Sequence, residues 1–280
     1  MKKTIMSLSL LGLLTGGSSP VFAACTDIGI GETTAEQHAA LKDALKASVA
    51  ASGGPSNGGL DVHMWATLVD EFGHVCAVTF SGENNRDQWP ASRPISMQKA
   101  YTANSLTISL VPGLWSTARL FYPTQPGQFL WGLDQSNPVN PAVVYGGDTG
   151  DWGAVGDPAV GLIPGGNNRF GGGLAIWKVV GVDVDGKDIN KVIGAIGVSG
   201  DTSCADHNIA LRVRDNLGLA HSITPYVDNI IYDIKNGKSA SGLGHPTCPG
   251  GQEDEINTQI TGITHPLHDD FPKNHPGIGH

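Results

Sequence analysis

The amino-acid sequence predicts an α+β protein in which an antiparallel sheet is flanked by helices. Alternating segments joined in pairs by tight turns are typical of antiparallel strands. Helical patterns stand before, between and after these pairs, so helices are expected to cover the sheet. The chain has 280 residues, of which 40% are hydrophobic. That length is enough for one large domain or two small ones.

The first segment has the pattern of a secretory signal peptide, predicted over residues 1–24. Two lysines precede an apolar run over residues 5–14, and Val21-Phe22-Ala23 is the expected exit before cleavage after Ala23 or Ala24. This pattern predicts export to the periplasm or the medium. Lipidation at Cys25 is the less favoured alternative. After this point the sequence predicts no membrane-spanning segment.

The charge balance and the four cysteines limit the partners and the compartment. Removing the two lysines of the signal leaves 15 basic against 26 acidic side chains and no basic stripe. This argues against nucleic acid and anionic membrane as partners. An even cysteine count in an exported chain suggests two disulfides. We favour Cys25–Cys248 and Cys76–Cys204 among three connectivities, with buried thiols as the alternative.

The first half of the chain predicts a helix, a hairpin and a second helix. Thr33 and Glu36 have capping-box spacing at the start of a helix over 33–51. Residues 60–80 alternate as two strands of a hairpin. A second helix is expected over 95–110. Its apolar residues fall on two opposite sides, so its second side is buried against a neighbouring subunit, a ligand or a larger domain.

The second half begins with an irregular region over 111–173, rich in Gly, Pro, Asn and aromatics. Such a stretch indicates functional loops or packed irregular structure rather than a linker. Two strands follow across an Asp185-Gly186 turn, and the last clear helix is expected over 203–217. The signal then fades, and residues 226–234 could be a short strand or helix.

Five segments, in order, resemble the GlcG/HbpS-like family of small haem-binding proteins, also described as haem-degrading. They are "ATLVDEFGHVCAVTFSGE", "ISMQKAYTAN", "QPGQFLWGL", "IPGG" and "VIGAIGVSGDTSCADHNIA". The resemblance covers about residues 34–219. It implies a profilin-like sandwich with a five-stranded antiparallel sheet, frequent assembly into homo-oligomers, and haem as cofactor.

The chain also departs from the family pattern. The segments around 146–160 and 177–188, and everything after Leu219, look added. We therefore expect a GlcG/HbpS-like domain over residues 25–220 and a partly irregular C-terminal extension over 221–280. These additions could cover oligomer surfaces or reshape a pocket.

The "KAYTA" segment supplies the first candidate ligands. By resemblance, Thr102 is an iron contact, with Lys99 beside it. Tyr101 or Trp residues are expected against the macrocycle, because a porphyrin offers a broad flat π surface. A neutral hydroxyl would hold iron weakly, which suits sensing or transfer of haem. The structural alternative is a threonine bonded to its own helix carbonyl.

The "SGDTS" turn supplies the second group. Gly200 allows a tight backbone, and the following helix start presents free N–H groups that suit a haem propionate. Asp201 would repel an anion, so capping of the helix by its own turn is the favoured alternative. His207, in the first turn of this helix, is the histidine best placed to meet a ligand or its metal.

Other patterns are weaker. The tail over 265–280 is rich in His and Asp and suggests adventitious metal affinity. Asp148, Asp151 and Asp157 could contact calcium but lack EF-hand spacing. His74 and the Asp70-Glu71 pair look like turn residues.

The function that the sequence favours is that of an exported haem-binding protein, with degradation or sensing of haem as finer possibilities. One alternative is a non-enzymatic accessory protein that binds a protein partner. Another is a binder of a different small organic ligand or a corrinoid. Serine-hydrolase, P-loop and HExxH zinc motifs do not occur in the sequence.

Overall fold

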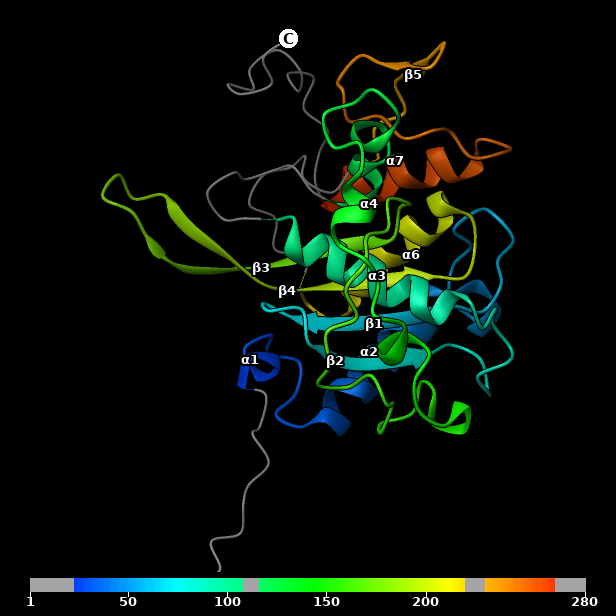
Figure 1. Ribbon diagram of the computed structural model, residues 1–280, viewed down its shortest axis with the longest axis vertical. Helices are drawn as coiled ribbons and strands as arrows, with labels where there is room; N and C mark the ends of the chain where they lie inside the picture. Colours follow the sequence, from blue (N-terminus) through cyan, green and yellow to red (C-terminus); the bar gives the residue numbers. More distant parts are fainter. Residues whose placement is uncertain (1–22, 108–115, 220–229, 265–280) are drawn as a thin grey trace, which may run out of the picture.

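A four-stranded antiparallel sheet forms the centre of the molecule (Figure 1). The computed structural model describes residues 23–107, 116–219 and 230–264. The strands are β1 (Trp65–Asp70), β2 (Val75–Phe80), β3 (Gly173–Val182) and β4 (Asp188–Ser199), in the spatial order β2-β1-β4-β3. The predicted antiparallel sheet with flanking helices is confirmed.

The expectation of a five-stranded sheet is wrong for the described residues. The segment beside the free edge of β2 makes only a single β-bridge, between Val75 and Val160. Val75 N donates to Leu162 O at 3.0 Å, and Gly161 N donates to Val75 O at 2.8 Å. A positive φ of 80° at Gly161 turns the segment away, and Pro164 follows without an N–H. A continuous ladder therefore cannot form there.

Two helices cover one face of the sheet. They are α2 (Thr34–Ser48) and α6 (Ser203–Asn216). The predicted capping box is confirmed, since Glu36 N donates to Thr33 Oγ1 and the Glu36 carboxylate accepts the Thr33 N–H. Leu41 and Leu45 of α2 share a fully buried core with Leu68 of β1. This core holds the largest group of buried apolar residues.

The third helix, α3 (Ser92–Ser105), covers the other face, beginning three residues before and ending five residues before the expected bounds. It lies close to β4, because a Cβ at Gly197 would come within 2.1 Å of Ser96 O. Met97 and Ala100 pack on Trp65 in a second core. The outer side of α3 is buried too, so the expected two-sided burial is confirmed.

The chain itself covers the outer side of α3. Residues 116–172 fold over it as packed loops and single helical turns, as expected for this region (Figure 1). The short elements here and elsewhere are α1 (Ala23–Thr26), η1 (Ala50–Ser52), η2 (Thr117–Leu120), η3 (Tyr122–Thr124), α4 (Leu133–Ser136), α5 (Pro141–Val144) and η4 (Thr149–Asp151). The buried Arg93 of α3 donates to Val144 O of α5 at 2.7 Å.

The C-terminal extension is more ordered than the sequence indicated. It contains a small hairpin, β5 (Ile234–Lys235) with β6 (Lys238–Ser239), and a helix, α7 (Gln252–Thr264), that packs on α6. The sequence analysis missed α7. Residues 1–22 of the predicted signal peptide and the His-rich tail over 265–280 lie outside the described residues. Among the residues described, no helix is both long and apolar enough to cross a bilayer.

Both disulfides are present, but the favoured pairing is wrong. Cys25 bonds Cys76 with a Cα–Cα distance of 5.7 Å, and Cys204 bonds Cys248 with 6.2 Å. The reason is topological. Cys76 lies on β2 at one edge of the sheet, whereas α6, which carries Cys204, packs over β4 and β3 at the other. β1 and β4 thus separate the two cysteines that we expected to pair.

Candidate functional site

The "SGDTS" turn binds the chain's own backbone. Asp201 Oδ1 accepts N–H groups from Leu60 at 2.8 Å and from Thr202 at 2.7 Å. At Gly200 a Cβ would come within 2.8 Å of Met64 Sδ. The turn therefore holds the loop before β1 next to the start of α6.

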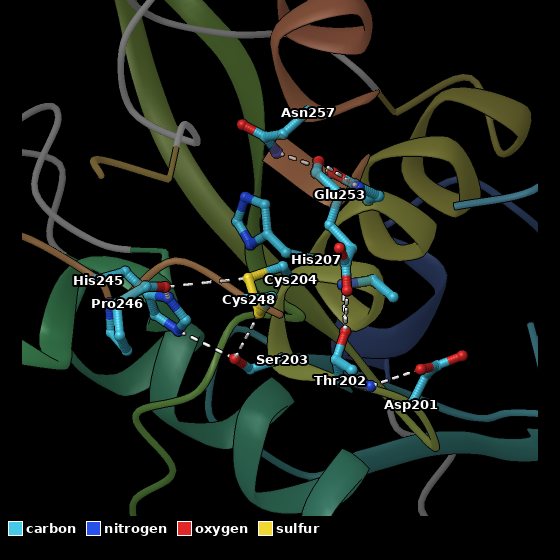
Figure 2. Close-up of a disulfide and its surroundings, with 12 residues drawn as sticks. Asp201, Thr202, Ser203, Cys204, His207, His245, Pro246, Cys248, Glu253 and Asn257 are labelled. Carbon is cyan, nitrogen blue, oxygen red and sulfur yellow. Dashed lines mark hydrogen bonds between the residues drawn. A yellow bond between two sulfur atoms is a disulfide. The ribbon is translucent and has the colours of Figure 1, made fainter. Parts of the chain in front are cut away.

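The start of α6 is already capped and already faces a carboxylate (Figure 2). Thr202 Oγ1 accepts the Ala205 N–H at 3.2 Å and lies 3.2 Å from Glu253 Oε1. Glu253 belongs to α7 and is 1% exposed. The Cys204–Cys248 disulfide fixes the extension beside this helix start. The chain's own carboxylate thus contacts the helix start that we considered for a propionate.

A histidine that the sequence analysis passed over contributes to the same junction. His245 is buried between the rings of Phe121 and Tyr232. Its Nδ1 lies 2.7 Å from Pro246 O, and its Nε2 lies 3.2 Å from Ser203 Oγ (Figure 2). Burial lowers the pKa of His245 to about 4, so the imidazole is neutral at physiological pH. Both nitrogens are engaged in holding the extension on α6.

Lys99 forms a buried ion pair between α3 and α6. Its Nζ lies 2.5 Å from Asp206 Oδ2 and donates to Val198 O at 3.1 Å. Burial raises the pKa of Asp206 to about 6, against the opposing effect of the Lys99 charge. Burial likewise lowers the pKa of Lys99. Lys99 therefore joins α3 to α6, although these two helices cover opposite faces of the sheet.

Thr102 and His207 are bonded by one loop, residues 167–173. Asn168 N donates to Thr102 Oγ1 at 2.9 Å, and Gly172 N donates to His207 Nδ1 at 3.4 Å. Both side chains are 0% exposed. The structure thus brings Thr102, His207 and Lys99 together around this loop, inside the protein. The expected role of these residues at a ligand stays a prediction.

Tyr101 lies at the other end of the sheet. A Cβ at Gly73 would come within 2.7 Å of the Tyr101 ring, so the ring packs over the β1–β2 turn. The pairing Trp65↔Ser199 places Gly200 near the start of β1, whereas this turn follows its end. Asp201 N donates to Asp206 Oδ1 at 2.8 Å, and Asp206 is the residue that Lys99 also bonds, so the "SGDTS" turn adjoins the Lys99 group. The six predicted site residues therefore fall into two places, with Tyr101 apart from the others, and do not line one slot.

The β1–β2 turn carries an oriented, partly exposed imidazole. Asp70 Oδ1 accepts the N–H groups of Phe72 and His74, each at 2.9 Å, and Asp70 Oδ2 lies 3.1 Å from His74 Nδ1. The side chain of Asp70 is 1% exposed and that of His74 is 29% exposed. A carboxylate bonded to Nδ1 fixes the orientation of the imidazole, and the same arrangement is found behind many metal-binding histidines.

Exposed apolar side chains lie on the segments next to this imidazole. The Phe72 ring is 65% exposed, with its centroid 6.4 Å from that of His74. Leu162, whose carbonyl accepts the Val75 N–H, and Ile163 beside it are 46% and 40% exposed. With the half-buried Tyr101, they form what we call the turn surface: Phe72, His74, Tyr101, Leu162 and Ile163. From the sequence, His74 was predicted to be a solvated turn residue, and this arrangement was not foreseen.

The calcium hypothesis has no support from the geometry. Both carboxylate oxygens of Asp157 bond the Arg93 guanidinium, at 2.5 and 3.0 Å, inside the protein. Asp148 instead accepts the Gly150 N–H at the start of η4. Across the described part of the chain, no three His, Cys, Asp or Glu side chains gather as a metal site would require.

Family comparison identifies the class of this protein. The model of the HbpS-like family, described as "Haem degrading protein HbpS-like", matches residues 34–214. The chain belongs to this family, which confirms the resemblance seen in the sequence. No curated protein matches the chain.

Solved structures show more distant likeness. Klebsiella pneumoniae OrfY is 24% identical, with 66% of this chain and 88% of that chain covered and a TM-score of 0.37. PduOC, solved as a haem complex, is 22% identical, with 64% and 89% covered and a TM-score of 0.38. The Streptomyces reticuli HbpS double mutant is 16% identical, with 76% and 97% covered and a TM-score of 0.34.

Proposed function

We propose that the protein binds haem at the turn surface, with His74 as the axial ligand through Nε2. Membership of the HbpS-like family over residues 34–214 supports haem as the ligand. The bond between buried Asp70 and His74 is the observation that carries the choice of site. Imidazole is a common axial ligand of haem iron, and exposed apolar side chains suit the flat macrocycle.

The buried residues around the 167–173 loop fit a haem less well. Thr102 and His207 have no exposed surface, and a backbone N–H already bonds each of them. Lys99 is engaged by Asp206. A macrocycle could reach these side chains only after the loop had left them. At the turn surface the apolar side chains of Phe72, Leu162 and Ile163 are already exposed.

Each residue of the turn surface has a distinct role in this proposal. His74 holds the iron, and Asp70 keeps the imidazole oriented. Phe72 and Leu162 offer apolar area to the ring. Haem held on a surface exchanges readily, which agrees with binding, sensing or transfer.

Degradation of haem is the finer proposal, taken from the description of the family. Bound haem supplies the redox chemistry that peroxide needs to open the ring. The chain's contribution is to hold the ring where solvent peroxide reaches it. Release of bilin and iron on adding peroxide, lost in His74→Ala, is the expected result. Export, which the sequence predicts, belongs with this proposal, since haem acquired outside the cytoplasm needs an exported carrier.

The test is an optical titration with haemin. The wild-type protein is expected to give a saturable Soret shift at one haem per chain. His74→Ala should remove the shift, and Asp70→Asn should weaken binding by about 10–100-fold. His63→Ala is the matched control, because His63 is also a half-buried imidazole but its Nδ1 bonds Ser81 Oγ at 3.0 Å, away from the turn.

The outcomes separate the function from the site. If the wild-type protein gives no saturable shift, haem binding itself is wrong. If the wild-type protein binds and His74→Ala binds equally well, the function stands and the turn surface is wrong. Circular dichroism on each variant shows whether it has folded.

A further inference from the structure

The β3–β4 hairpin leaves the sheet at the end that carries the turn surface. The last residue of β1, Asp70, pairs with Gly194 of β4, whereas β4 itself begins at Asp188. The hairpin therefore runs past the β1–β2 turn, and Figure 1 shows it projecting from the sheet on the left, on the same side as α1. Residues 177–188 are one of the segments that look added to the family pattern, so contacts made here belong to this chain in particular.

Two lysines stand side by side at the base of this hairpin. Lys178 of β3 pairs with Lys191 of β4, so their side chains lie on the same face. Like charges directly opposite each other are destabilising, and an anion bound between them relieves that repulsion. Ile189, two residues from Lys191 and 46% exposed, adds apolar surface beside them. We call Lys178, Ile189 and Lys191 the hairpin base.

The hairpin base is tied to the β1–β2 turn. Lys191 Nζ forms an ion pair with Glu71 Oε2, and Glu71 directly precedes Phe72 of the turn surface. Asp70, on the other side of Glu71, bonds His74. One tight turn therefore carries the imidazole, the exposed aromatic ring and the carboxylate that holds the ammonium group.

His74 and Lys191 also point to the same side of the sheet. Cys76, two residues after His74, and Ile193, two residues after Lys191, lie in the core that α2 covers. Because side chains alternate along a strand, His74 and Lys191 lie on this side as well. β2 and β4 flank β1, so their backbones are about 10 Å apart. That span suits a ring held by its iron near one strand and by carboxylates near the other.

Both ammonium groups can accept a further anion. The side chains of Lys191 and Glu71 are 50% and 20% exposed, so their ion pair contributes little and exchanges readily. Lys178 Nζ donates at 3.4 Å to a backbone carbonyl, that of Asp27. An ammonium group carries three N–H donors, so each lysine can keep its present partner and still bond an incoming carboxylate.

We propose that the hairpin base binds the propionate carboxylates of the haem held at the turn surface, an inference that rests on the function proposed above. Haem carries both propionates on one edge, so the two lysines turn that edge toward the hairpin. The apolar edges then face Phe72 and Leu162. The hairpin base thereby selects flat ligands with acidic groups on one edge over macrocycles without them.

Optical titration with two forms of the ligand tests the hairpin base. Haemin carries both carboxylates, whereas haemin dimethyl ester has the same ring and iron with both carboxylates blocked. Lys178→Met/Lys191→Met should weaken haemin binding about five- to tenfold, as expected for two partly exposed ion pairs, and should leave the affinity for the ester unchanged. Added salt should weaken haemin binding by the wild-type protein more than by this variant, because salt screens exposed charges.

A second lysine pair supplies the matched control. Lys235 of β5 pairs with Lys238 of β6, and both are exposed on the C-terminal extension. Lys235→Met/Lys238→Met removes the same charge from another two-stranded ribbon and should leave haemin binding unchanged. Circular dichroism shows whether each variant has folded.

The outcomes separate this inference from the proposed function. Haemin binding that depends on His74 but is unchanged in Lys178→Met/Lys191→Met overturns the hairpin base alone. An equal loss of haemin and ester binding in this variant also overturns it, because the lysines would then act without the carboxylates. A wild-type protein that does not bind haemin overturns both proposals.

Discussion

Removing the Cys204–Cys248 disulfide should cost the protein about 4 kcal/mol of stability. The bond joins residues 44 apart in the sequence, and the loop-closure entropy of a loop of that length gives about 4 kcal/mol at 25 °C. Both sulfurs lie where the extension meets α6, so their loss removes the covalent tie at this junction (Figure 2). The perturbation is Cys204→Ala/Cys248→Ala, which leaves no unpaired thiol.

Urea unfolding, followed by circular dichroism, measures the change. Cys25→Ala/Cys76→Ala is the comparison, because its loop spans 51 residues and predicts nearly the same loss. Thiol titration of the denatured variants checks the connectivity, since each of these two double variants should show no free thiol. Cys25→Ala/Cys248→Ala should show two. A loss below about 1 kcal/mol, or free thiols in the first variant, would refute the reasoning.

Three further predictions concern the residues around α3. Burial raises the pKa of Asp206 from 3.8 to about 6, so its carboxyl contributes stability that is complete below pH 3.8 and lost as the pH rises through 6. Lys99→Met should therefore lower the free energy of unfolding by about 3–5 kcal/mol at pH 7 and by less at pH 5, measured in urea; an equal loss at both pH values would contradict this. Gly197→Ala sets a Cβ 2.1 Å from a carbonyl of α3 and should cost about 3 kcal/mol or more, whereas Gly156→Ala, with nothing within 4 Å, should change the midpoint little. Thr102→Val should cost about 1 kcal/mol in the same assay, through one lost hydrogen bond, and should leave the Soret titration unchanged.

Local signals in the sequence were enough to predict most elements of the sheet and its helices. Thr33 and Glu36 identify the start of α2 because both partners of a capping box lie within one turn. Gly186, with a φ of 77°, lies in the turn that joins β3 to β4, where the Asp-Gly pair predicts a turn. These interactions join residues only a few positions apart, so a single sequence reveals them.

Contacts between distant segments were not predictable in the same way. The cysteine pairing depends on which sheet edge each cysteine occupies, which no local pattern encodes. α7 was missed because its anchors are distant: Asn208 of α6 donates to Glu253 O at 3.0 Å and accepts from Asn257 at 3.0 Å. In proteins most helical stability comes from tertiary packing, and these packing partners lie far away in the sequence.

The site illustrates both cases. In the sequence, Thr102 and His207 look available to a ligand. In the structure, residues 167–173 fold over both side chains and form hydrogen bonds to them. The Asp70–His74 pair could have been found, because an Asp that ends one strand and a His that precedes the next face each other across a tight turn. The sequence was instead interpreted as placing a solvated His74 beside an Asp70 that only shapes the turn.

The structure of the haem-loaded protein tests the central claim most directly. We expect iron within bonding distance of His74 Nε2, the macrocycle against Phe72, and the 167–173 loop still bonded to Thr102. Iron beside Thr102 or His207, with that loop displaced, would contradict the account.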